Sequence, residues 1–101
     1  MKSDSSELSR AEVDRRITDI RGKMDRLDAT LVGLLNERAA YATKIGHLKD
    51  LVGLEIYQPN REIEVLNNVR SHNQGPLPDN AVGRLFERII DETRRLERSH
   101  S

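Results

Sequence analysis

A regular spacing of apolar residues through the first half of the chain predicts one long helix. From about Leu8 to Val52 there is no proline, and glycine occurs only at positions 22, 33 and 46, each at a cost of about 1 kcal/mol relative to alanine. The apolar positions alternate in steps of three and four, as on one face of a helix. This apolar seam consists of Ile17, Ile20, Met24, Leu27, Leu31, Leu34, Tyr41, Ile45, Leu48 and Val52.

Two shorter helices are predicted after a break at Gly53. Pro59 suits the first turn of the second helix, where a missing N–H costs nothing, and the polar segment 73–78 ends that helix. Its apolar side is Ile63, Leu66 and Val69. Asp79 or Asn80 can cap a third helix. The stripe of that helix is Val82, Leu85, Phe86, Ile89, Ile90, Thr93 and Leu96.

These elements predict an all-α fold with three helices per chain, the first very long. At about 1.5 Å per residue that helix is about 60 Å long, whereas a compact domain of 100 residues has a radius of gyration of about 13 Å. Its seam therefore needs a second chain, most simply a symmetric copy. We expect an intertwined helical homodimer, with a domain over residues 10–98, a polar flexible tail over 1–9 and a short tail over 99–101.

Composition excludes several classes of protein. The 17 basic and 17 acidic side chains cancel, which argues against a dedicated binder of nucleic acid or membrane surfaces. Three aromatic residues are too few for a base-stacking platform, and the lack of cysteine excludes disulfides, thiolate nucleophiles and cysteine-ligated zinc. There is no apolar run of about 20 residues, and the first nine residues are polar. We therefore expect a soluble, cytoplasmic protein.

One cation interrupts the apolar seam. Arg38 lies seven residues after Leu31 and three before Tyr41, and a guanidinium in that register needs an anion or a set of acceptors. Lys49 follows 11 residues later, on nearly the same face and about 16 Å along the axis. The two side chains could hold a small anion between them. Alternatively, Arg38 pairs with a carboxylate of the protein and Lys49 is solvated.

Further polar residues occupy positions that could serve the same anion. Arg61 lies in the first turn of the second helix, where a positive charge opposes the helix dipole, and Glu62 follows it. Thr93 and Glu97 fall on the stripe of the third helix. The simpler alternatives are a Thr93 hydroxyl bonded to its own backbone and a solvated Glu97 carboxylate. Gly46 suits close packing better than a ligand contact.

Five segments of the sequence resemble, in order and spacing, the all-helical class of chorismate mutases. The likeness covers about Val13 to Arg98 and extends to the mutase domain that precedes prephenate dehydratase in bifunctional proteins, and to those fused to an aromatic-pathway synthase. The segments are Ile20-Arg21-Gly22-Lys23-Met24-Asp25-Arg26-Leu27-Asp28, Leu34-Leu35-Asn36-Glu37-Arg38, Ile45-Gly46-His47-Leu48-Lys49, Tyr57-Gln58-Pro59-Asn60-Arg61-Glu62 and Arg84-Leu85-Phe86-Glu87-Arg88-Ile89-Ile90.

This resemblance implies an isomerase of phenylalanine and tyrosine biosynthesis, in the shikimate pathway. Such enzymes convert chorismate, a dianion, to prephenate by a pericyclic rearrangement, without cofactor, metal or covalent intermediate. By position, Arg38 would hold one carboxylate and Thr93 would support a carboxylate through its hydroxyl. Arg21 would reach into the site of the partner chain. The spacing agrees, because Arg21 and Arg38 are 17 residues apart, about 25 Å along one helix.

The resemblance also assigns the remaining positions. Glu62 and the backbone at Gln58 would take the substrate hydroxyl, and Arg61 would add positive field. Negative charge grows on the ether oxygen as the carbon–oxygen bond breaks, and donors fixed there stabilise the transition state. Lys49 would be one donor and Glu97 the other. Some family members carry glutamine at the latter position, whereas a glutamate donates only when protonated, so the pH range of activity is affected.

Two other functions compete with this one. An isochorismate-pyruvate lyase has the same helical fold and the early arginines, but the pair Arg61-Glu62 and the acidic donor Glu97 favour the mutase. A non-enzymatic helical dimerisation or regulatory domain would explain the apolar seam equally well, yet it would need no cation in that register. The three histidines lack the paired spacing of a metal site, and there is no glycine-rich phosphate loop.

Overall fold

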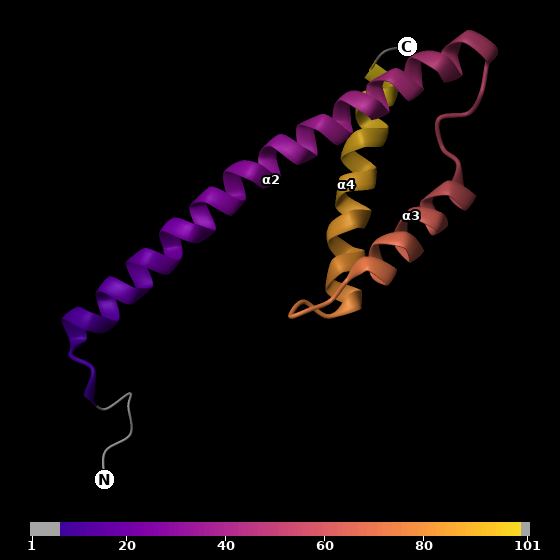
Figure 1. Cartoon of the computed structure of the whole chain (residues 1–101). Coiled ribbons are helices and arrows are strands. Elements are labelled where there is room, and N and C mark those ends of the chain that lie inside the picture. The colour runs from indigo at the N-terminus through magenta and orange to yellow at the C-terminus, as the bar shows by residue number, and fades with distance from the viewer. Residues whose placement is uncertain (1–6, 100–101) are drawn as a thin grey trace. The chain divides into compact units, whose positions relative to one another are not determined.

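The computed structural model describes residues 7–99, and every regular element in that range is helical (Figure 1). Helix α2 spans Arg10–Val52, α3 spans Pro59–His72 and α4 spans Asp79–Ser99. This order confirms the predicted all-α fold with its long first helix. Residues 1–6 and 100–101 of the two predicted tails lie outside the described residues, and α4 continues one residue past the expected domain end at 98.

Both ends of α2 are set by local hydrogen bonds. At its start the Glu12 N–H donates to Ser9 Oγ at 3.0 Å, which satisfies one of the free donors of the first turn. At its end Gly53 has φ +70°, and the Leu54 N–H donates to the Lys49 carbonyl at 2.9 Å. This is the usual glycine-terminated helix end. It places Lys49 in the last turn of the helix.

The chain forms two compact units, Met1–Leu34 and Leu35–Ser101, and α2 contributes to both. In the second unit α4 runs back along α3 after the turn over residues 73–78 (Figure 1). Asn73 organises that turn, because its Nδ2 donates to the Leu77 carbonyl and to Asp79 Oδ1 at 2.8 and 2.7 Å. The side of α4 that faces inward includes the buried Gly83 and Ile90.

Small residues bring the last turns of α2 close to α4. Ala42 and Gly46 are the buried residues of α2. A Cβ placed on Gly46 would lie only 3.0 Å from Cα of Glu97, so the glycine permits a backbone approach that a larger residue would prevent. Gly46 is therefore a close-packing position, as its sequence context favours. This contact brings the end of α4 to the end of α2.

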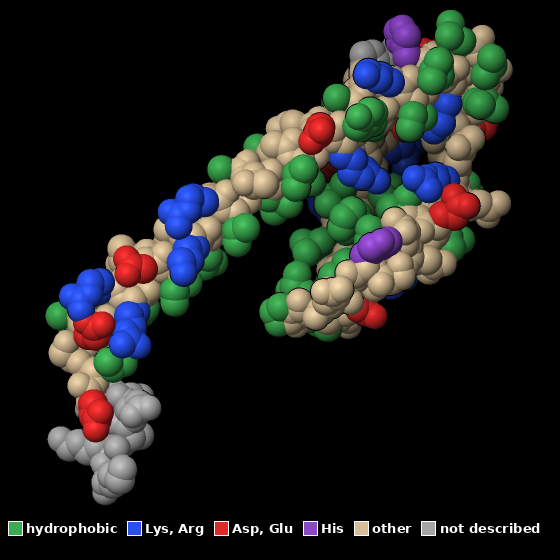
Figure 2. Space-filling view, viewed as in Figure 1, with side chains coloured by type: hydrophobic (Ala, Val, Ile, Leu, Met, Phe, Trp, Pro, Cys, Tyr) green, Lys and Arg blue, Asp and Glu red, His purple; other side chains and the backbone are tan. Residues whose placement is uncertain are grey.

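The apolar seam of α2 is exposed in the single chain. Its side chains stand out from the helix, and hydrophobic atoms line much of α2 in the view of Figure 2. The exposed members are Ile17, Ile20, Met24, Leu27, Leu31, Leu34, Tyr41, Ile45, Leu48 and Val52. Within residues 7–99, no helix combines the length and the apolar character needed to cross a membrane.

Candidate active site

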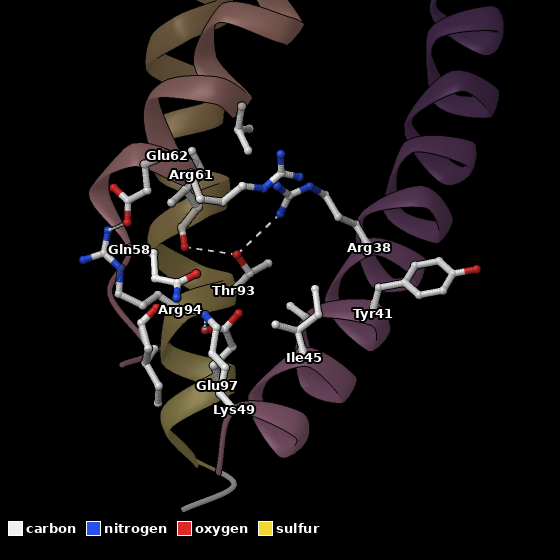
Figure 3. A pocket seen from close by; sticks show the side chains of 14 residues that line it. Arg38, Tyr41, Ile45, Lys49, Gln58, Arg61, Glu62, Thr93, Arg94 and Glu97 are labelled. Atoms are coloured by element: carbon white, nitrogen blue, oxygen red, sulfur yellow. Dashed lines mark hydrogen bonds and ion pairs between the residues drawn. The ribbon is translucent and has the colours of Figure 1, made fainter. Parts of the chain in front are cut away.

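A pocket of about 360 Å³ lies within the second unit, between the end of α2, the start of α3 and the last turns of α4. Figure 2 shows Lys and Arg side chains gathered around this hollow, and Figure 3 shows its wall from close by. Four cationic and two anionic side chains line it, so its wall carries two net positive charges. They are Arg38, Lys49, Arg61, Arg94, Glu62 and Glu97.

Lys49 and Glu97 form a part-buried ion pair at one end of the pocket. Lys49 Nζ donates to Glu97 Oε2 at 3.1 Å and to the Ile56 carbonyl at 3.0 Å. The two side chains are only 12% and 13% exposed. The alternatives of a solvated Lys49 and a solvated Glu97 are therefore wrong. Each charge offsets the desolvation of the other, and the close approach at Gly46 makes the pairing possible.

Arg38 reaches α4 from the middle of α2. Its Nη1 donates to Thr93 Oγ1 at 3.4 Å, and the Thr93 hydroxyl in turn donates to the carbonyls of Ile89 and Ile90, at 3.0 Å each. The alternative bond from Thr93 to its own helix is thus present, and the same oxygen also accepts from Arg38. Among the described residues Arg38 has no carboxylate partner, so the single chain does not offer the ion-pair alternative for this residue.

Two guanidinium groups converge at the upper part of the pocket in Figure 3. Arg38 extends from α2 and Arg61 from the first turn of α3, and their charged ends point toward each other. Burial, and secondly the charge of Arg61, lowers the pKa of Arg38 from its usual value. Both causes disfavour the charged form, and a bound anion would counteract both. The exposed Arg61 side chain also lies 3.5 Å from Glu64 Oε1.

The start of α3 supplies Gln58 and Glu62. Gln58 is the N-cap, and its carbonyl accepts from the N–H groups of Arg61 and Glu62 at 3.1 and 3.3 Å. The carbonyl is thus engaged by the first turn, so we expect the N–H to be the backbone group of Gln58 that meets a ligand. The Glu62 carboxylate is half-buried and pairs with Arg94 (Figure 3).

Arg94 is a pocket residue that the sequence did not reveal. It lies on α4 directly after Thr93, and it contacts Glu62, which is 32 residues earlier in the chain. Its only sequence signal is its place beside a predicted site residue. The pairing follows from the way α4 packs against α3, which local spacing does not specify.

Seven of the eight predicted site residues line this one pocket. They are Arg38, Lys49, Gln58, Arg61, Glu62, Thr93 and Glu97. The eighth, Arg21, belongs to the unit Met1–Leu34 and does not line it. The individual roles of all eight stay predictions. Among residues 7–99, the histidines and carboxylates form no cluster suited to a metal ion.

Comparison with known proteins gives the family. The chain is 41% identical over 86 residues to the bifunctional chorismate mutase/prephenate dehydratase of Neisseria gonorrhoeae, covering 85% of this chain and 23% of that protein. It is 24% identical over 86 residues to the chorismate mutase of Methanocaldococcus jannaschii, covering 84% and 87%. The chain therefore spans about a quarter of the length of the bifunctional relatives it matches.

Solved structures and a family-wide sequence comparison agree with the resemblance seen in the five segments. The structure of chorismate mutase (form II) from Thermus thermophilus superimposes with a TM-score of 0.81 at 36% identity, over 82% of this chain and 94% of that one. The sequence model described as chorismate mutase type II matches residues 20–98. The predicted resemblance is thereby confirmed, and the chain belongs to the chorismate mutase type II family.

Proposed function

We propose that this chain converts chorismate to prephenate, the rearrangement that leads toward phenylalanine and tyrosine. The observation that carries the proposal is the pocket in the second unit. Its wall has two net positive charges, two guanidinium groups converge in it without a carboxylate between them, and a part-buried lysine lies at its other end. A small dianion with a reacting oxygen between its charged groups matches that arrangement.

Substrate binding falls to residues from all three helices of the second unit. Arg38 pairs with one carboxylate, and Arg61 adds positive charge nearby. The hydrogen of the Thr93 hydroxyl turns from the helix carbonyls toward the ligand. Glu62 and the Gln58 N–H take the substrate hydroxyl at the start of α3. The converging guanidiniums support this assignment, because an anion between them counteracts the burial and, secondly, the repulsion by Arg61 that lower the pKa of Arg38.

Catalysis is stabilisation of the charge that develops as the carbon–oxygen bond breaks. The electrons of that bond move within the substrate, so no group of the protein forms a covalent bond to it. Lys49 donates to the ether oxygen, where negative charge grows. In the free chain two of the three ammonium N–H groups donate to the Ile56 carbonyl and the Glu97 carboxylate. The third is left for the substrate. The two existing bonds hold Lys49 in place before the substrate arrives.

Glu97 is the second donor to the ether oxygen in this proposal. In the free chain its carboxylate accepts a hydrogen bond from Lys49, so it must take up a proton when the substrate binds. The arrival of two negative charges beside it favours that uptake.

The complete site contains residues of two chains. The seam of α2 is exposed in the single chain, and its burial against a second copy would remove a large apolar surface from water. Arg21 and Arg38 are about 25 Å apart along the helix axis, too far for both to hold one small ligand from the same chain. We therefore propose a homodimer in which Arg21 binds a carboxylate in the partner's site.

Two measurements distinguish this function from its alternatives. Purified protein should remove chorismate, followed by absorbance, and chromatography should show prephenate as the product. A Lys49→Ala protein serves as the control for background rearrangement. Release of pyruvate from isochorismate, with no prephenate from chorismate, would instead identify the lyase. If neither compound reacts, the remaining alternative is a non-enzymatic dimerisation domain. Such a domain would not need a positively charged pocket.

A further inference from the structure

One cation of the pocket wall, Arg94, has no part in the mechanism above. It comes from α4, one residue after Thr93, and its side chain is 23% exposed. Its Nη2 pairs with Glu62 Oε2. In the proposed function, the Glu62 carboxylate accepts a hydrogen bond from the substrate hydroxyl. The same nitrogen lies 3.5 Å from Asp91 Oδ1 on its own helix.

The guanidinium of Arg94 also contacts a second residue at the start of α3. Its Cζ lies 4.9 Å from the centre of the Tyr57 ring. A planar guanidinium can donate from its edge to a carboxylate while its face stacks on an aromatic ring, which a lysine cannot do. Tyr57 precedes the N-cap Gln58, and Glu62 belongs to the first turn of α3. Arg94 thus contacts one residue just before the start of α3 and one residue in its first turn.

The same segment is tied to α2 as well. The Ile56 carbonyl, next to Tyr57, accepts from Lys49 Nζ at 3.0 Å. Residues 56–62 are therefore held from α4 by Arg94 and from α2 by Lys49. Because Glu62 is only 27% exposed, its ion pair is screened less than a surface pair would be. This wall of the pocket is fixed before any ligand enters.

We propose that Arg94 is a positioning residue, which orients the Glu62 carboxylate and fixes residues 56–62 so that the pocket is formed in advance. The inference rests on the proposed function for the role of Glu62. The ion pair engages Oε2, which leaves the other oxygen, Oε1, to accept from the substrate hydroxyl. No bond to that hydroxyl forms or breaks, and the new negative charge grows on the ether oxygen, so losing the arrangement weakens ground state and transition state alike. The effect of Arg94 is then on KM more than on kcat.

The kinetic test compares Arg94→Ala with a matched control on the same helix. Arg95→Ala removes an equal charge from the next position, where the arginine is exposed and pairs with Glu92. Arg94→Ala should raise KM about tenfold, the equivalent of one charge-assisted hydrogen bond, with kcat within about threefold. Arg95→Ala should leave both constants unchanged. Equal effects of the two substitutions would overturn the proposal, because they would reflect the net charge of α4.

A double-mutant comparison shows whether Arg94 acts through Glu62. In a Glu62→Ala protein the further change Arg94→Ala should alter KM by no more than about twofold, since the carboxylate it orients is gone. A full tenfold loss in that background would overturn the positioning role. Arg94→Lys keeps a charge near Glu62 but lacks the stacked plane, so its KM should lie between those of wild type and Arg94→Ala. Wild-type KM in Arg94→Lys would exclude any need for the Tyr57 contact.

Hydrogen exchange on the ligand-free protein tests, independently of the reaction, whether Arg94 fixes residues 56–62. Arg94→Ala should speed exchange in a peptide covering residues 56–65 by at least about tenfold, whereas Arg95→Ala should not. Faster exchange with an unchanged KM would overturn the proposal by reducing Arg94 to a structural role. Unchanged exchange would overturn it even with a mutase-active wild type. If the wild type is inactive on chorismate but Arg94→Ala still speeds exchange, the proposed function is contradicted. The contact of Arg94 with residues 56–62 would then still be supported.

Discussion

Helix α2 presents two different surfaces, before and after Leu34. In the first part the apolar side chains are large and exposed, with Leu27 at 68%. In the second part the buried residues are small, with Ala42 at 8% and Gly46 against the backbone of Glu97. Both parts carry the same apolar spacing. The second part differs because it also carries, off the seam, the two small buried residues Ala42 and Gly46, which let it pack within the chain.

The chemistry of the pocket depends on the part with small residues. Where α4 approaches α2 closely, Lys49 is enclosed with Glu97, and Arg38 meets Thr93. The apolar side chains nearby on α2, Tyr41 and Leu48, stay exposed. Arg38, a cation in the register of the seam, thus lines the pocket together with two seam residues, Tyr41 and Ile45. The two surfaces can be tested separately, because substitutions in one should spare the other.

The largest expected effect is the loss of the dimer on placing a charge in the first part of the helix. Leu27→Glu should leave the helical content unchanged, because this side chain is exposed in the single chain. In a dimer it would bury an unpaired charge on each chain, at a cost of several kcal/mol. Sedimentation should therefore show a monomer. Leu51→Glu is the matched control, exposed on the same helix but off the seam, and a monomer there as well would refute the assignment.

Lys49→Ala should abolish most catalysis while sparing association. We expect turnover to fall by about 100-fold or more, as when one preorganised donor to a developing oxyanion is removed. Lys44→Ala is the control, because Lys44 lies over the exposed Tyr41 ring and does not itself line the pocket. Steady-state kinetics and sedimentation together decide. A folded, dimeric Lys49→Ala protein with near-normal turnover would place the donor elsewhere.

Mixed dimers test whether Arg21, in the first part of α2, and Arg38, in the second part, serve the same site from two different chains. Arg21→Ala and Arg38→Ala proteins should each be weak alone. After subunit exchange about a quarter of wild-type activity should return, because half of the randomly formed dimers are mixed and each mixed dimer has one intact site. Activity that stays at the level of the parent proteins would mean that the site does not span two chains.

The pH dependence of turnover tests Glu97 within the pocket. Because only the protonated carboxyl donates, wild-type turnover should fall as rising pH removes that proton in the substrate complex. Glu97→Gln supplies a donor at every pH, so its profile should be flat at the alkaline end, while Glu97→Ala should be poor throughout. If wild type and Glu97→Gln share the same alkaline decline, another group titrates and Glu97 is not the donor.

The smallest effect concerns the close approach itself. Gly46→Ala should gain about 1 kcal/mol of helix propensity but lose about 1–3 kcal/mol by forcing α4 away, because the new Cβ would lie 3.0 Å from Glu97 Cα. Turnover should also fall, as Lys49 and Glu97 separate. Gly33→Ala meets nothing within 4 Å and should be neutral or stabilising. Thermal unfolding checks both, and a more stable, fully active Gly46→Ala would contradict the packing argument.

Local sequence determined the three helices of the described residues and their ends. Periodicity at three and four residues, Pro59 in a first turn and Gly53 after a last turn act through neighbours within a few positions. The ends at Val52, Pro59 and Asp79 follow from these signals. The candidate residues came from the family resemblance together with that spacing, and seven of the eight line one pocket.

Tertiary structure alone decided which of those residues meet and whether their charges are solvated. Lys49 and Glu97 are 48 positions apart, and Arg38 and Thr93 are 55 apart. Spacing along a single helix therefore left the solvated and the paired alternatives open for these residues. The sequence did not reveal Arg94 for the same reason, since its pairing with Glu62 arises only when α4 packs against α3. Helix periodicity depends on neighbours one turn away, whereas contacts between helices depend on how closely two backbones approach, which the missing side chain of Gly46 sets.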